Sequence, residues 1–140
     1  MKKLLFILLL PLCCIGENEV KRTYYPSGNI LSEIHYTNGV REGSCKYFWD
    51  GVWAIKSAVH YKNGKLIGSS KTYNKEGRLI EEGQYKYSEI GVYSQKDGVW
   101  KAYYSSGTLK SEVEYINGKA TNWKNYDTKG KILPINKGNC

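Results

Sequence analysis

Short stretches of the chain place apolar or small residues at every second position. Residues 30–36 and 109–115 both follow this pattern. A period of two with one apolar side predicts a half-buried β-strand. Asn-Gly pairs come directly after such stretches at 38–39, 63–64 and 117–118. Because Asn-Gly favours the positive φ angles of tight turns, each stretch is expected to begin a β-hairpin.

Four copies of one unit align along the chain. Their first halves lie at 28–39, 51–64, 77–85 and 107–118, and their second halves at 43–47, 68–73, 98–103 and 122–126. The unit is about two dozen residues long, within the range of known repeat periods. The sequence therefore predicts an all-β fold: an elongated antiparallel meander of about four β-hairpin repeats, with about eight strands.

The copies depart from one another in four places. Ala58 replaces a repeated Glu, and Gly83 stands where Ile or Val is expected. Two residues are inserted around Trp53, and six more lie within 86–97. Insertions in repeat proteins often form the binding face, although a longer hairpin explains the 86–97 segment equally well.

Composition agrees with strands and turns. The 140 residues include 13 Tyr and 15 Gly, and the formal net charge is +8. This length allows one small domain and excludes a large two-domain enzyme. With 41% apolar residues, the composition is not that of a disordered chain. We expect residues 24–130 to form the repeat domain and residues 131–140 to form a C-terminal tail.

The first 16 residues have the pattern of an export signal. A short basic start precedes the apolar run 4–12, which is too short to span a bilayer, since a spanning helix needs roughly 20 residues. Two cleavage patterns fit: a lipoprotein signal with lipidation of Cys13 or Cys14, or ordinary cleavage after Gly16. The polar segment 17–23 is expected to be a linker. We therefore expect an exported protein, either periplasmic or membrane-anchored as a lipoprotein, or alternatively secreted.

The residues between Gly107 and Tyr126 resemble the bacterial variant of the MORN repeat. They read Gly-x-Leu-x-x-Glu-x-x-Tyr-x-Asn-Gly, and a Trp-x-x-Tyr segment follows. The resemblance extends over about residues 24–130. It implies an elongated antiparallel sheet with no enzymatic site of its own. Many bacterial proteins of this variant are catalogued as antitoxins of toxin–antitoxin systems, and other MORN proteins are associated with membranes, lipids or protein scaffolding.

The polar candidates for chemistry have simple structural explanations. His35 and His60 precede the same repeat Tyr, and no convergent cluster surrounds them, so we expect outward-facing polar positions. Glu33, Glu82 and Glu112 also repeat and could bind Ca²⁺. They should lie about two strands, or roughly 10 Å, apart, so cross-strand pairing with Lys or Arg is expected instead.

The remaining cysteines, Cys45 and Cys140, lie in the first unit and beyond the fourth. Three units place them roughly 30 Å apart, whereas a disulfide needs Cα atoms within about 7 Å. We expect free thiols, or an intermolecular link through Cys140. No zinc motif is present, and neither a metal nor a cofactor is expected.

Lys71, Lys101 and Lys124 share one repeat position, next to Trp100 and Trp123. A basic and aromatic row could follow a nucleic-acid backbone or an anionic membrane surface. Interleaved Glu residues and export argue against nucleic acid. The expected partner is a protein, including a toxin, or an envelope or lipid surface.

These patterns favour an exported, non-catalytic module that binds or scaffolds at the cell envelope. The alternative is an antitoxin or immunity protein that neutralises a toxin by direct binding. An enzyme ranks third, because no nucleophile–base pair, metal set or phosphate loop appears. The residues expected to form the contact surface are Tyr87, Ile90, Tyr93, Trp100, Tyr103 and Trp123.

Overall fold

The computed structural model describes residues 16–88 and 93–134. The expected lipidation sites Cys13 and Cys14, the loop residue Ile90 and the terminal Cys140 lie outside the described residues.

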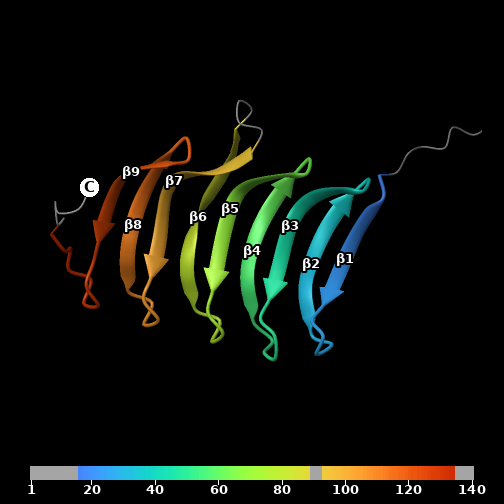
Figure 1. The fold of residues 1–140 in the computed structure, drawn as a ribbon, viewed down its shortest axis with the longest axis horizontal. Helices are drawn as coiled ribbons and strands as arrows, with labels where there is room; N and C mark the ends of the chain where they lie inside the picture. The colour runs from blue at the N-terminus through green and yellow to red at the C-terminus, as the bar shows by residue number, and fades with distance from the viewer. Residues whose placement is uncertain (1–15, 89–92, 135–140) are drawn as a thin grey trace, which may run out of the picture.

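Nine antiparallel strands form one open sheet in chain order (Figure 1). The strands are β1 (Asn18–Tyr24), β2 (Ile30–Thr37), β3 (Val40–Phe48), β4 (Ile55–Lys62), β5 (Lys65–Tyr73), β6 (Leu79–Ser88), β7 (Tyr93–Tyr103), β8 (Leu109–Ile116) and β9 (Lys119–Asn125). The predicted all-β meander of hairpins is confirmed. In the part of the chain that the structure describes, no helix is able to cross a membrane.

The strand that the sequence did not predict is β1, which occupies most of the expected linker 17–23. It pairs with β2 from Asn18 to Tyr24. All seven residues of β1 are exposed at the edge of the sheet, so the strand can have the polar sequence that is also typical of a linker. The segment 22–28 matches the repeat segment 101–107. Both begin with a basic residue, continue with a Tyr-Tyr pair and end in a Ser-Gly turn. The strand is therefore a half unit of the same repeat.

The predicted hairpin turns are confirmed. Asn38, Asn63 and Asn117 have φ of 53°, 51° and 50°, and the Gly after each has φ of 76°. In the third hairpin the inserted segment continues β6 and β7, with Lys86 opposite Gln95 and Tyr87 opposite Ser94. The described part of the insertion is thus a longer hairpin.

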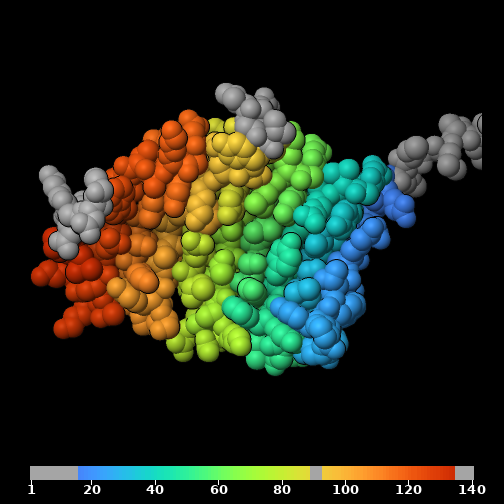
Figure 2. All heavy atoms as spheres, viewed as in Figure 1, coloured from blue at the N-terminus to red at the C-terminus, as the bar shows by residue number. Residues whose placement is uncertain are grey.

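Within the described residues the sheet is a single layer. Figure 2 shows one face as successive bands of strands, with no other described segment across them. A register shift interrupts every strand pair in the described chain. Such bulges bend strands and increase their twist, consistent with the bowed strands of Figure 1.

One face carries the small core of the molecule, and we call it the tyrosine face. Ile34, Cys45 and Trp100 are its buried apolar side chains. Residues directly opposite each other on paired strands share a face. The middle row of the tyrosine face therefore runs through Ile34, Cys45, Val59, Ser70 and Gly83, then through Trp100, Val113 and Trp123, and a parallel row holds Tyr36, Tyr61, Tyr85 and Tyr115.

Trp100 explains why Gly83 departs from the repeat. A Cβ at Gly83 would overlap the indole of Trp100, so the missing side chain makes room for the ring. The rings of Tyr85 and Tyr115 meet it edge-on, at centroid distances of 5.1 and 6.4 Å. The indole Nε1 donates a hydrogen bond to the carbonyl of Gln84 at 3.1 Å.

Candidate binding site

The opposite face carries a row of alternating charges, which we call the charge ladder. Its members are register partners on successive strands: Arg22, Glu33, Lys46, Ala58, Lys71, Glu82, Lys101, Glu112 and Lys124. Ion pairs join Arg22 to Glu33 at 3.0 Å, Lys71 to Glu82 at 3.9 Å and Lys101 to Glu112 at 3.9 Å. The predicted cross-strand pairing of the three repeated Glu residues is confirmed.

Two steps of the ladder also include a tyrosine hydroxyl. Tyr103 Oη donates to Glu82 Oε1 at 2.6 Å, and Tyr126 Oη donates to Glu112 Oε2 at 2.8 Å. Burial, together with the hydrogen bond to Glu82 and the charge of that carboxylate, raises the pKa of Tyr103 to about 12. The hydrogen bond to Glu112 likewise raises the pKa of Tyr126. Each of these carboxylates therefore lies between a lysine and a tyrosine hydroxyl.

The first two hairpins break this arrangement in complementary ways. The tyrosine lies two residues after the ladder cation, and in the first hairpin Phe48 takes its place. Among the described residues no hydroxyl consequently donates to Glu33, and both of its side-chain hydrogen bonds come from Arg22. In the second hairpin Tyr73 is kept, but Ala58 replaces the carboxylate.

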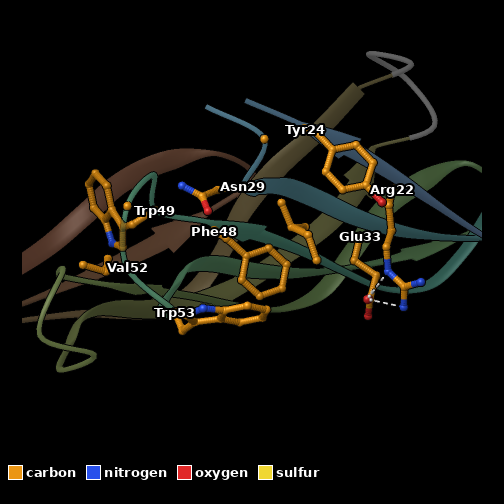
Figure 3. A pocket seen from close by; sticks show the side chains of 11 residues that line it. Arg22, Tyr24, Asn29, Glu33, Phe48, Trp49, Val52 and Trp53 are labelled. Atoms are coloured by element: carbon orange, nitrogen blue, oxygen red, sulfur yellow. Dashed lines mark hydrogen bonds and ion pairs between the residues drawn. The ribbon is translucent and has the colours of Figure 1, made fainter. Parts of the chain in front are cut away.

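An apolar groove of about 520 Å³ opens beside Phe48. We call it the aromatic groove, and the residues that define it are Arg22, Tyr24, Ile30, Glu33, Phe48 and Trp53. Figure 3 shows the rings of Phe48 and Trp53 next to each other, with the Arg22–Glu33 pair to one side. The groove thus combines aromatic walls with a satisfied ion pair at its rim.

Trp53 is the most exposed large apolar residue of the described chain, with 97% of its surface open. It lies in the turn between β3 and β4, where the sequence carries its insertion. The same turn is held by two residues that precede Trp53, Trp49 and Asp50. Asp50 accepts hydrogen bonds from Ser27 Oγ at 2.6 Å and Asn29 Nδ2 at 3.0 Å, and these bonds lower its pKa. Trp49 Nε1 donates to the carbonyl of Tyr73 at 3.1 Å. The turn is therefore fixed by hydrogen bonds while the indole of Trp53 is exposed to solvent.

The residues expected to form the contact surface do not come together. Trp100 is only 3% exposed and packs the tyrosine face, where Trp123 is 48% exposed near the edge. Tyr103 lies on the ladder face. Tyr87 and Tyr93 lie on the extension of the third hairpin, where the ammonium of Lys65 lies 3.9 Å from the Tyr87 ring centre. Ile90 falls between the described ranges.

The other polar candidates are placed as follows. His60 is exposed opposite Ser44, and His35 is half-buried on the same face as the ladder. Within residues 16–88 and 93–134, no three His, Cys, Asp or Glu residues gather as metal ligands would. Cys45 is a buried free thiol, and its burial raises its pKa. Lys101 and its neighbour Trp100 point to opposite faces, so the lysines and tryptophans that could have formed a basic and aromatic row do not share one face.

Sequence reasoning did not identify the aromatic groove. Its walls come from β1, β2, β3 and the turn after β3, and only the register brings them together. Two signals pointed toward it: the insertion around Trp53, and Phe48 in the place of a repeated tyrosine.

The comparisons with known proteins concern the repeat. The family model described as the MORN repeat variant matches residues 20–38 and 96–117. No curated protein matches the chain. A crystal structure of the GtfA/B complex bound to UDP and GlcNAc is similar over 92% of this chain and 25% of that chain, with 17% identity and a TM-score of 0.33. A likeness at that TM-score carries no argument about function. The two matched segments, from β1 into β2 and from β7 into β8, support a repeat of the MORN variant.

Proposed function

We propose that the chain is a binding module that holds a protein partner at the aromatic groove and catalyses no reaction of its own. The observation that carries this proposal is Trp53, fully exposed on a held turn beside an apolar groove. An indole left in water forgoes roughly 2–3 kcal/mol of burial, which contact with a partner would recover. Trp is also enriched among the residues that dominate binding energy at interfaces.

The shape of the groove favours a protein side chain as its occupant. The groove lies on an open sheet, has an apolar centre and is bordered by the Arg22–Glu33 ion pair. An apolar centre with a polar rim is the usual anatomy of a protein interface. The partner would insert one large apolar side chain between Tyr24, Phe48 and Trp53.

We further propose that the module acts outside the cytoplasm, at the cell envelope. The export pattern of residues 1–16 supports this location, with lipid attachment at Cys13 or Cys14 or release after cleavage. The alternative is an antitoxin or immunity protein whose partner is a toxin, which the resemblance of the sequence supports. A toxin that acts in the envelope would reconcile the two proposals.

A pull-down from envelope extracts tests the binding proposal. The mature chain is used as bait, captured proteins are identified by mass spectrometry, and the affinity of each purified candidate is measured by calorimetry. Trp53→Ala should weaken the specific partner about 30-fold, the effect of losing a dominant interface residue worth about 2 kcal/mol. Trp123→Ala is the matched control, because it removes an exposed indole from the other face.

Circular dichroism verifies that both variants keep their strands. Loss of binding in both variants, or in neither, contradicts a partner seated at the aromatic groove.

A further inference from the structure

We propose that the gap in the charge ladder at Ala58 receives a carboxylate from the partner. An Asp or Glu side chain of the bound protein would occupy the place of the missing Glu, held by the Lys46 ammonium and the Tyr73 hydroxyl. This inference rests on the proposed function, because it names the chemistry that the same face recognises.

The intact steps of the ladder show how this face binds a carboxylate. At Glu82, Oε2 lies 3.9 Å from Lys71 Nζ on the preceding strand, and Oε1 accepts from Tyr103 on the following strand. At Glu112, one oxygen again faces the preceding lysine, and the other accepts from Tyr126. The repeat therefore supplies two examples of a carboxylate bound between a preceding Lys and a following Tyr.

The corresponding groups around Ala58 are present and unused. Lys46 is the register partner of Ala58 on the preceding strand, as Lys71 is of Glu82. Among residues 16–88 and 93–134, Lys46 forms no ion pair and the Tyr73 hydroxyl forms no hydrogen bond. The neighbouring carboxylate of Glu33 is taken by Arg22 from the other side.

Lys71, on the far side of the gap, is engaged with Glu82. The Tyr73 hydroxyl and the Lys46 ammonium are therefore both available to bind one carboxylate, through a charge-assisted hydrogen bond and an ion pair.

The gap lies beside the aromatic groove, because both include residues of β3. Lys46 and Phe48 lie two residues apart on one face of β3, a separation of about 7 Å. Tyr73 and Trp53 together line a second hollow, of about 550 Å³, on the other side of the indole. One segment of a partner can therefore place an apolar side chain against Phe48 and Trp53 and an acidic side chain over Ala58. Without Lys2 and Lys3 of the proposed export signal, the formal net charge of +8 becomes +6, which still favours such an acidic segment.

Acetate is the direct probe of this site and requires no partner. The methyl signal of Ala58 and the ring signals of Tyr73 are followed by NMR as sodium acetate replaces sodium chloride at constant ionic strength. We expect saturable shifts at these signals in the wild-type chain, and none in Ala58→Glu, where the chain supplies the carboxylate itself. Shifts that do not saturate, or that survive in Ala58→Glu, overturn the proposal.

A second measurement uses the partner identified with the Trp53 variants. Ala58→Glu should weaken that partner at least about fivefold, because the site is filled and like charges repel. Ala58→Gln is the matched control: it fills a similar volume without charge, and it should bind several-fold more tightly than Ala58→Glu.

The two proposals fail separately. If acetate does not bind while partner capture still depends on Trp53, the carboxylate site alone is wrong. If acetate binds but no partner depends on Trp53, the proposed function is wrong and Ala58 marks only a carboxylate site.

Discussion

At the scale of single residues, a side chain on this sheet is fitted to its neighbours across the strands. In the second hairpin, large Val59 lies opposite small Ser70. The third hairpin reverses these sizes, with Gly83 on the first strand and Trp100 on the second. The described residues form one sheet with no second layer behind it. Large and small side chains along a row must therefore fill the space between the strands together.

We therefore predict that Gly83→Ala destabilises the fold by about 1–3 kcal/mol, because the added methyl overlaps the indole of Trp100. The double variant Gly83→Val with Trp100→Ser copies the second hairpin and should be more stable than the sum of the two single changes implies. Urea denaturation of the three variants measures this coupling. Strictly additive losses would show that the two positions do not compensate each other.

The hydroxyl of Tyr103 makes stability depend on pH at the alkaline end. Its pKa is about 12 in the folded chain, against 10.0 ordinarily. A pKa raised by folding contributes stability that is complete below the unfolded value and is lost as pH rises through the folded value. We predict that the free energy of unfolding falls between pH 10 and about 12, and that Tyr103→Phe removes part of this fall.

Denaturation curves at a series of pH values check this prediction, and a Tyr103→Phe chain with an unchanged pH profile contradicts it. Tyr24→Phe is the matched control, because Tyr24 forms no hydrogen bond to a carboxylate in the described part of the chain.

At the scale of elements, the Asn-Gly turns set the hairpins, and their surroundings differ. Gly39 and Gly118 share a φ of 76°. A Cβ at Gly39 would meet nothing within 4 Å, whereas a Cβ at Gly118 would lie 3.1 Å from Gln95 Cβ on the extended third hairpin. The turn of the fourth hairpin is thus packed against the insertion, and Gly118 N also donates to the carbonyl of Lys96 at 3.2 Å.

We predict that Gly39→Ala costs about 1–2 kcal/mol, the price of a left-handed conformation alone. Gly118→Ala should cost more, because the added methyl also crowds Gln95. Thermal and urea unfolding of the two variants side by side measures the difference. Equal losses would mean that the third hairpin does not support the fourth turn.

Local sequence was enough to predict the hairpins, because alternation and Asn-Gly turns are encoded within a few residues. It was not enough for β1, whose exposed polar residues are those of an edge strand and of a linker alike. It also misjudged which aromatic residues are open. Trp100 is covered because Gly83 makes room for it, whereas Trp53 is 97% exposed in the turn after β3. Which side chains cover each other depends on the register between strands, and the register could not be predicted from the local sequence.

At the scale of the whole molecule, each strand pairs only with its neighbours in the chain. Hydrogen bonds from side chains to the ends of later strands tie the units together. Tyr25 Oη donates to the carbonyl of Phe48 at 2.8 Å, and Tyr104 Oη donates to that of Tyr126 at 2.8 Å. Stability in such an array is close to a sum of units and of contacts between nearest neighbours.

The order of the strands has a mechanical consequence. Strands β1 and β9 lie at opposite edges of the sheet (Figure 1). A pull between these edges runs along the inter-strand hydrogen bonds, and because the strand pairs are in series, all of them carry the same force and the weakest pair separates first. The sheet would then unfold one strand after another under a low and nearly constant force, instead of rupturing in a single step at high force. A protein held at one edge and loaded at the other would behave as an extensible strap.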